Sequence, residues 1–324
     1  MPDALLVEIF TEELPPKALP RLAAAFAEEV LNGLVQAQLK ETNPGGIRRF
    51  ATPRRLGVLV PGVLRNAPDR REEKKLMPAK VAFDPDGKPT TALLKRLEKE
   101  GESAESVGKL ERRSDAGTEQ VFLSRFIPGA ELGSALQQVL EQAVAALPIP
   151  KVMRYQTEGE QVEFIRPAHG LVALHGSEIV PVIVLQLQAG RVTHGHRFQG
   201  AQNITLAHAE EYESKLRTEG GVIASFEERR EEIIRQLVAQ ASSLSADLRL
   251  DERTELLDEV AALVEFPTVY VGEFEQEFLA VPQECLILTM QQNQKYFPLF
   301  GRDGRLLNRF LIVSNMRLED PANI

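Results

Sequence analysis

The segment Arg191–Phe198 (RVTHGHRF) holds the densest set of residues that could do chemistry. It places Arg191, Arg197, two histidines and Phe198 within eight residues and contains no acidic side chain. Arginine binds phosphate, an aromatic ring stacks on an unpaired base, and glycine lets a backbone approach closely. The segment therefore favours contact with a single-stranded nucleic acid. A structural strand turn, in which an arginine caps a carboxylate, is the open alternative.

The two histidines of this segment also suggest a metal pair. His194 and His196 are spaced with the period of a β-strand, which predicts both rings on one strand face. Zinc needs a third and a fourth ligand, and the neighbouring sequence offers no obvious set. We therefore expect no metal here and assign His196 to the nucleic-acid contact.

Two other segments have similar chemistry. Arg54 and Arg55 lie at a tight connection between two predicted strands, where a pair of guanidinium groups could clamp a backbone phosphate. The segment 291–297 (QQNQKYF) combines amides, which can read base edges, with Lys295 and Tyr296. Its alternative is a polar loop that runs into a core strand.

The sequence lacks the motifs that mark common catalytic sites. It has no GxxxxGK[ST] phosphate loop, no GxGxxG after a strand, and no HExxH, CxxC or GxSxG motif. The single cysteine, Cys285, precedes three apolar residues, which predicts a buried and unreactive thiol. We therefore predict no catalytic residue, metal or cofactor in this chain.

Charge is unevenly distributed along the chain. The 324 residues carry a formal net charge of −9, which by itself argues mildly against a nucleic-acid partner. Residues 48–75, however, contain nine basic and three acidic side chains, whereas residues 247–265 contain seven acidic and two basic ones. Phosphate contacts depend on the local field, so a basic surface remains compatible with the acidic total. Two ordinary solvated faces of opposite sign are the alternative.

Composition is typical of a globular cytoplasmic protein, with 43% hydrophobic and 26% charged residues. One cysteine excludes an internal disulfide framework and fits a reducing compartment. The first residues do not resemble a signal peptide, and no run reaches the roughly 20 apolar residues that a membrane span needs. We expect a cytoplasmic location and no membrane partner.

The first part of the chain, 1–190, is predicted to be an α/β domain. Apolar runs predict strands, and helical spacing predicts helices up to residue 39 and over 132–147. The strands are expected at 5–10, 48–50, 56–63, 170–175 and 179–188. Many charges and prolines without periodicity begin at residue 66. We interpret 66–127 as a small inserted module, with a helix at 91–100 and a hairpin of 110–113 against 120–126.

The second part, 191–324, is predicted to be an α+β domain. Ser225 and Glu228 form a capping box ahead of a helical apolar face, and a second helix covers 256–263. Strands are predicted at 268–272, 286–290, 296–300 and 310–314. Strands and helices mixed at irregular intervals favour a multi-domain α+β protein with mixed or antiparallel sheets packed by helices.

Eight segments resemble, in the same order, the β subunit of the bacterial two-subunit glycyl-tRNA synthetase. They are LVEIFTEELPPKAL near the N-terminus, FATPRRL (50–56), LPIPKVMRY (147–155), FIRPAHGL (164–171), GHRF (195–198), VIASFEERREEI (222–233), LLDEVAALVEFP (256–267) and FLAVPQECLILTMQQNQKYFPLF (278–300). They cover nearly the whole chain, and the basic turn and the GHRF segment lie within them.

The resemblance implies an α2β2 ligase in which the α subunit holds ATP, Mg and glycine and the β subunit recognises tRNA(Gly). No DNA partner is implied. A full β subunit continues with an HD-type and an anticodon-binding domain, so the chain is expected to be the front part of a longer protein. The resemblance also implies that the second half is similar to the editing-domain fold of the phenylalanyl-tRNA synthetase β chain.

Three functions follow from this resemblance. The first is a non-catalytic, tRNA-recognising part of glycine–tRNA ligase, which is our prediction. The second is hydrolysis of mischarged tRNA, which would need a polar pocket around His169, His194, His196 or Thr289. The third is a structural module that docks the α subunit. For the first function, the predicted tRNA contacts are Arg54, Arg55, Arg191, His196, Arg197, Phe198, Lys295 and Tyr296.

Overall fold

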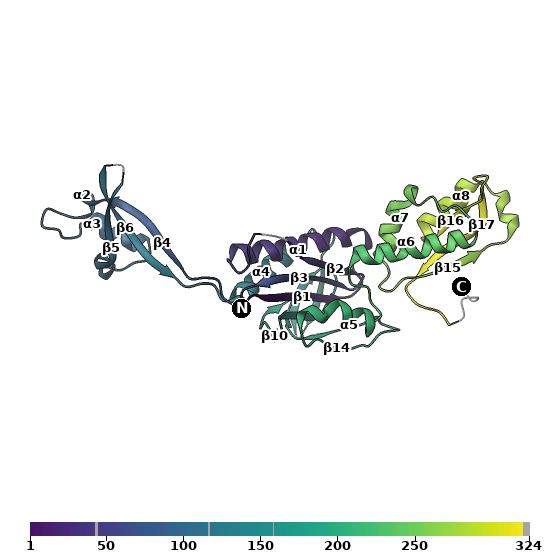
Figure 1. Cartoon of the computed structure of the whole chain (residues 1–324), viewed down its shortest axis with the longest axis horizontal. Coiled ribbons are helices and arrows are strands. Elements are labelled where there is room, and N and C mark those ends of the chain that lie inside the picture. Colours follow the sequence, from purple (N-terminus) through teal and green to yellow (C-terminus); the bar gives the residue numbers. More distant parts are fainter. Residues whose placement is uncertain (43–44, 116, 158, 320–324) are drawn as a thin grey trace. The chain divides into compact units, whose positions relative to one another are not determined.

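A five-stranded antiparallel sheet forms the first core of the computed structural model, which describes residues 1–42, 45–115, 117–157 and 159–319 (Figure 1). In the strand order β10-β9-β1-β3-β2, the strands span Glu178–Ile179, Ala168–His175, Asp3–Thr11, Arg55–Val63 and Arg48–Thr52. The central strand β1 is buried from Ala4 to Thr11. A strand buried on both faces has a continuous apolar sequence, which explains why the signal at 5–10 was clear.

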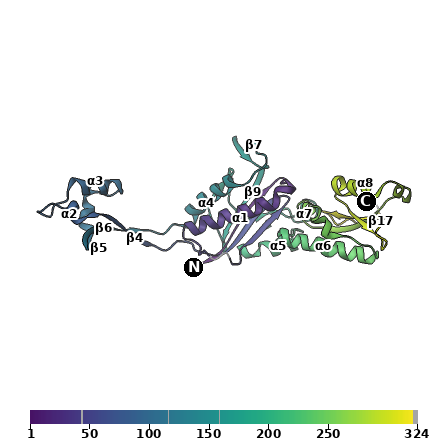
Figure 2. The same ribbon diagram turned by 90° about the horizontal axis from the view of Figure 1, so that it is seen from above.

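Two helices cover one face of this sheet. After the short helix η1 (Pro16–Ala18), α1 (Leu19–Gln36) packs on β2 and β3, and α4 (Leu132–Ala146) lies beside α1 (Figures 1 and 2). The apolar residues that predicted the α1 helix are all buried: Leu19, Leu22, Phe26, Val30 and Leu34.

The opposite face of the sheet packs against residues beyond 190, which the sequence had assigned to a second domain. Leu6 and Val172 of the sheet share a core with Ile204, Tyr212 and Leu216. The elements of this region are β13 (Val192–Thr193), β14 (Ile204–Thr205), η3 (Ala209–Glu211) and α5 (Tyr212–Thr218). The first core therefore continues to Ala224.

Short antiparallel pairs complete this part of the chain. A hairpin is formed by β7 (Met153–Thr157) and β8 (Glu160–Phe164). The run predicted as one strand over 179–188 is divided into β10, β11 (Ile183–Val184) and β12 (Leu187–Gln188).

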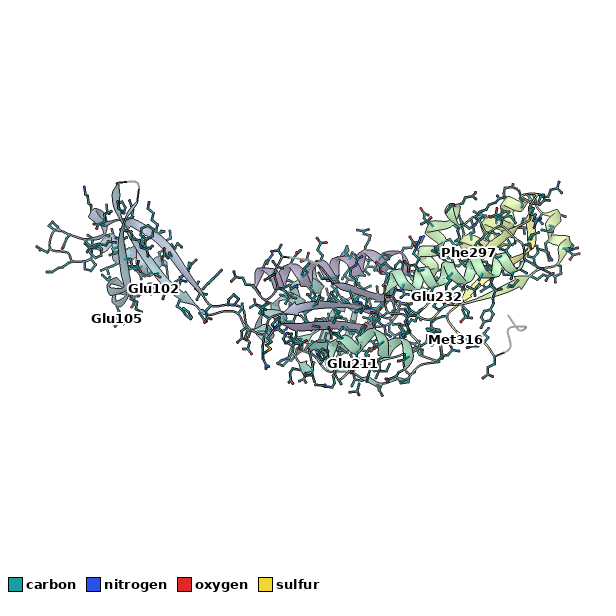
Figure 3. All side chains as sticks on the ribbon, in the orientation of Figure 1. Glu102, Glu105, Glu211, Glu232, Phe297 and Met316 are labelled. Atoms are coloured by element: carbon teal, nitrogen blue, oxygen red, sulfur yellow. The ribbon has the colours of Figure 1, made fainter. Side chains whose placement is uncertain are left out.

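A second core lies between two helices and a three-stranded sheet. The helices are α6 (Phe226–Ser243) and α7 (Thr254–Ala261), and η4 (Leu250–Arg253) precedes α7. The sheet has the order β15-β17-β16, over Thr268–Glu273, Leu306–Ser314 and Phe297–Phe300. Phe297 is fully buried there (Figure 3). The predicted capping bond is confirmed, since the backbone N–H of Glu228 donates to Ser225 Oγ at 3.2 Å.

The segment between β15 and β16 differs from the sequence prediction. Residues 286–290, predicted as a strand, belong to α8 (Gln283–Leu288) and to a π-helix, η6 (Thr289–Gln294), which follow η5 (Gln276–Ala280). A short apolar run has no periodicity that separates strand from helix, and this prediction was wrong. Cys285 is exposed, so the prediction of a buried thiol was also wrong.

Residues Asn66–Glu131 form a separate compact unit, where the sequence predicted a module over 66–127. Its sheet has the order β4-β6-β5, over Arg70–Pro78, Thr118–Ile127 and Leu110–Asp115. The helices α2 (Ala79–Ala82), α3 (Thr91–Lys99) and η2 (Ala104–Lys109) complete the unit. Its core contains Leu93, Leu97, Val121 and Leu123. The charged strand β4 had no apolar signal and was not predicted.

The predicted fold class is confirmed: the chain is a multi-domain α+β protein with small antiparallel sheets packed by helices. Among the described residues, every helix is too short or too polar to cross a membrane.

Candidate nucleic-acid interface

Arg55 lies inside the protein. Its side chain is 0% exposed, and its guanidinium nitrogens lie 3.3 Å from Oε2 of Glu8 and 3.3 Å from Oε1 of Glu265. It also donates to Thr52 Oγ1 at 3.1 Å and to the backbone carbonyl of His194 at 2.8 Å. The prediction of an exposed Arg55 that clamps phosphate was wrong, because carboxylates distant in the sequence bury and neutralise it.

The polar cluster around Arg55 is closely hydrogen-bonded. Glu8 accepts from Thr193 Oγ1 at 2.6 Å and from the Tyr212 hydroxyl. Burial alone lowers the pKa of Arg55, but Glu265 and then Glu8 outweigh burial and raise this pKa above its usual value. Burial and the Glu8 carboxylate raise the pKa of Tyr212, so its hydroxyl keeps the proton that it donates. The cluster joins β1, β3 and the segment after α7, and its role is structural.

Arg229 makes a second buried connection, between α6 and the first sheet. Its guanidinium donates to the backbone carbonyls of Ala51 at 2.7 Å, Ile223 at 2.6 Å and Ala261 at 2.9 Å. Burial lowers the pKa of Arg229 to about 10. Backbone carbonyls thus hold a buried charge where no sequence motif indicated one.

Arg54 has a different environment from its neighbour Arg55. Its side chain is partly buried, and its guanidinium carbon lies 4.7 Å from the centroid of the Phe10 ring. Within the described residues, the guanidinium has no hydrogen bond or ion pair, and its buried Nε has no partner. Burial, followed by the positive charge of Arg197, lowers the pKa of Arg54. A partly buried cation without an acceptor is costly, so this position favours an anion from outside the chain.

Arg197 lies at the same surface as Arg54. Its Nη2 is 3.1 Å from Oε2 of Glu12, whose Oε1 is 3.1 Å from Nε2 of His169. These three side chains are between 40% and 46% exposed. Burial alone raises the pKa of Glu12, but the hydrogen bond from Arg197, the charge of Arg54 and His169 outweigh burial and lower this pKa. Glu12 thus pairs with Arg197, whereas Arg54 feels the carboxylates of Glu265 and Glu12 without a direct hydrogen bond to either among the described residues.

Phe198 follows Arg197 and is the most exposed aromatic residue of this segment, at 73%. The next residue fixes the loop: Gln199 Nε2 donates to the backbone carbonyl of Arg317 at 2.7 Å, and Gln199 Oε1 accepts from the Arg317 backbone N–H at 3.0 Å. We call Arg54, Arg197, Phe198, Glu12 and His169 the Arg54–Arg197 patch. It combines Arg54, which has no acceptor among the described residues, with the ion-paired Arg197 and an exposed aromatic ring.

The two histidines of the RVTHGHRF segment do not share a strand face. β13 ends at Thr193, and the His194 ring packs 4.7 Å from the Phe10 ring. His196 is 1% exposed, and its Nδ1 accepts from the backbone N–H groups of Phe198 and Gln199. A buried imidazole that orders its own loop offers no surface to RNA, so the assignment of His196 as a direct contact was wrong. Over the described ranges, no group of three or more His, Cys, Asp or Glu side chains could hold a metal.

The remaining predicted contacts lie apart from the patch or are already engaged. Arg191 donates to the backbone carbonyls of Leu206 and Ser177, which is a structural role. Lys295 is 3.1 Å from Glu259 in the second core region, and Tyr296 stacks on Phe310. Arg54, Arg197 and Phe198 thus remain the candidate contacts, whereas Arg55 and His196 are buried beside them and the other three make contacts elsewhere.

Sequence reasoning missed Glu12, although its signal was present. Its motif, TEELPP, comes directly after the buried strand β1, and a carboxylate at a strand end can face other residues at the same sheet edge. Glu8 also had a signal: a charged residue in the middle of an apolar strand must be paired when it is buried.

Comparison with known proteins identifies the family of this chain. A family model described as glycyl-tRNA synthetase beta subunit matches residues 5–324. The glycine–tRNA ligase beta subunit of Aromatoleum aromaticum is 57% identical over 320 residues, which are 99% of this chain and 45% of that protein. The beta subunits of Methylobacillus flagellatus and Leptothrix cholodnii are 51% and 52% identical over 99% of this chain, which spans 46% and 45% of their lengths. The chain thus spans less than half the length of these relatives, and it belongs to the glycyl-tRNA synthetase beta subunit family.

Proposed function

We propose that this chain is the tRNA-contacting front part of a glycine–tRNA ligase beta subunit and that the Arg54–Arg197 patch binds tRNA backbone phosphate. The observation that carries the proposal is Arg54, a partly buried guanidinium without an acceptor, close to a second guanidinium at Arg197. A phosphate dianion or diester placed between them would supply the missing acceptors through charge-assisted hydrogen bonds.

Phe198 supports the choice of RNA over a small anion. Its side chain is 73% exposed and directly follows Arg197 in the sequence, and the loop that carries it is fixed by Gln199. Stacking of a base on an exposed ring contributes about 1–3 kcal/mol without sequence preference. A single-stranded or terminal region of tRNA offers both an unstacked base and a neighbouring phosphate.

We further propose that glycine activation, with its ATP and Mg, belongs to a separate α subunit that this chain accompanies. This division of labour is supported by the resemblance of the eight sequence segments and by the beta-subunit names of the relatives. A pyrophosphate-exchange assay with glycine and the purified chain tests it. Exchange that persists after all traces of α subunit are removed would contradict it.

A binding titration with tRNA(Gly) tests the patch. Arg197→Ala should weaken binding by about 1.5–3 kcal/mol, the range for a hydrogen bond to a charged group, and Lys should restore only part of it. The melting temperature should change little, because Arg197 is exposed and has one partner on the surface. Arg154→Ala, which removes another exposed and ion-paired arginine, is the matched control. Equal affinities for Arg197→Ala and Arg154→Ala would refute the proposal.

A further inference from the structure

A cleft of about 760 Å³ lies where the π-helix η6 faces α7 and the segment before it. Its volume is in the range of small-ligand sites. Three amides from η6, Gln291, Gln292 and Asn293, line one part of it. Lys17, from η1, also lines it. π-Helical turns are rare and are found frequently at functional sites.

The amides of this cleft have no partner inside the protein. In the part of the chain that the structure describes, the side chains of Gln291, Gln292 and Asn293 make no hydrogen bond, and Lys17 makes no ion pair. Paired donors and acceptors on an amide can bind the edge of a base, and adenine N6 and N7 match an Asn or Gln side chain best.

The wall opposite the amides is acidic. Four carboxylates line it: Asp251, Glu252, Glu255 and Glu259. Glu259 is paired with Lys295, and Oε2 of Glu252 lies 4.0 Å from Nη1 of Arg253. Asp251 and Glu255 have no basic partner among the described residues. Carboxylates repel backbone phosphates, but they accept hydrogen bonds from ribose hydroxyls, as in dinucleotide-binding sites.

A buried arginine forms part of the wall of the cleft. Arg253 lines the cleft with a side chain that is 4% exposed, and its Nε has no hydrogen-bond partner. Its Nη1 is held by the carbonyl of Leu248 at 2.9 Å and by that of Arg249. The protein itself thus holds Arg253 in the wall, and the lining side chains open to a ligand are the amides, the carboxylates and Lys17.

From this chemistry we infer that the cleft binds a ribonucleoside with free 2′ and 3′ hydroxyls, the group found at the 3′ terminus of an RNA. The amides would bind the base and Asp251 or Glu255 the hydroxyls. A terminal nucleoside brings one phosphate where an internal one brings two, and Lys17 is available for that phosphate. An acidic cleft thus selects a terminus over internal backbone.

The position of Lys17 connects the cleft with the Arg54–Arg197 patch. Lys17 is five residues beyond Glu12 of the patch, so their Cα atoms are at most about 17 Å apart. One short single strand could therefore contact both places. The assignment of the terminus to tRNA rests on the proposed function, whereas binding of a nucleoside by the cleft does not.

Equilibrium dialysis of the full chain against labelled adenosine tests the cleft itself. Adenosine should bind saturably, and 2′,3′-dideoxyadenosine at least tenfold more weakly, because a hydrogen bond to a charged carboxylate changes affinity by about ten- to 150-fold. A triple variant should weaken adenosine binding at least threefold; its changes are Gln291→Ala, Gln292→Ala and Asn293→Ala. The control is Gln276→Ala, which removes another exposed amide. Glu255→Gln should weaken the binding of adenosine but not that of 2′,3′-dideoxyadenosine. Glu277→Gln, at an exposed site outside the cleft, is the control.

Absence of saturable adenosine binding, or equal binding to the triple variant and the control, would overturn the inference. Intact tRNA and tRNA without its 3′-terminal nucleoside then identify the source of the ligand. If the terminus enters the cleft, its removal should weaken tRNA binding severalfold in the wild type and have no effect in the triple variant. Equal binding of both tRNAs would overturn the RNA assignment and leave the patch untouched. Adenosine binding without any tRNA binding would support a free-nucleoside site and refute the proposed function.

Discussion

Replacement of Arg55 by leucine should cause a large loss of stability, although the residue lies in a basic turn motif. The change leaves Glu8 and Glu265 buried without their shared cation, at 1% and 3% side-chain exposure. Removal of one partner from a buried ion pair costs about 3–5 kcal/mol, out of a total stability of about 5–15 kcal/mol. At a few degrees per kcal/mol, the melting temperature should fall on the order of 10 °C.

Arg54→Leu is the matched control for this experiment. It removes the same charge from the adjacent residue, where the structure shows a contact with Phe10 and no ion pair among the described residues. The loss of that cation–π contact costs about 0.5–1 kcal/mol. Thermal melts followed by circular dichroism compare the two variants directly.

A double variant separates charge burial from loss of packing. Glu265→Gln in the Arg55→Leu background removes one of the two uncompensated carboxylates and should recover part of the lost stability, since the two groups are in contact. If Arg55→Leu melts within about 2 °C of Arg54→Leu, or if the second change lowers the melting temperature further by its full single-variant effect, the structural role of the cluster is refuted.

Three further outcomes are expected. Glu12→Gln should strengthen tRNA binding, because it removes the carboxylate that competes with phosphate for Arg197; unchanged or weaker binding in a filter assay would contradict this. Gly129→Ala should destabilise the 66–131 unit, because a Cβ there would lie 1.7 Å from the Ala67 carbonyl oxygen. Gly108→Ala is the control, because its Cβ would meet no atom within 4 Å, and equal rates of proteolysis for the two variants would refute the prediction. Ser225→Ala should lower the unfolding free energy by about 1 kcal/mol through loss of the α6 cap, measured by urea titration against Ser243→Ala at the other helix end.

Local patterns in the sequence predicted much of the fold. Helical spacing identified α1, α4 and α6, and the capping box located the start of α6 at Phe226. These signals depend on residues within a few positions of one another. The π-helix η6 and α8 were missed because their apolar run is short and has no clear period.

The site was predicted only in part, because its chemistry depends on contacts between distant residues. Arg54 and Arg55 are adjacent in the sequence, yet of these two only Arg55 forms an ion pair with Glu265. Glu265 lies 210 residues beyond Arg55 in the chain. Likewise His194 and His196 have strand spacing, but the strand ends at Thr193, and the two rings make different contacts. In a single sequence, the only sign of such a long-range partner is a charged residue within an apolar run, as at Glu8.

The salt dependence of tRNA binding tests the central claim, that Arg54 and Arg197 contact backbone phosphate. Each phosphate neutralised contributes about −0.7 to −0.9 to the slope of log K against log salt concentration. Both arginines hold the same phosphate, so the variant with both Arg54→Ala and Arg197→Ala should bind more weakly than wild type, with a slope flatter by about 0.7 to 0.9. The control, Arg154→Ala with Arg305→Ala, removes two exposed arginines outside the patch and should keep the wild-type slope. Equal slopes for the patch variant and the control would contradict the account.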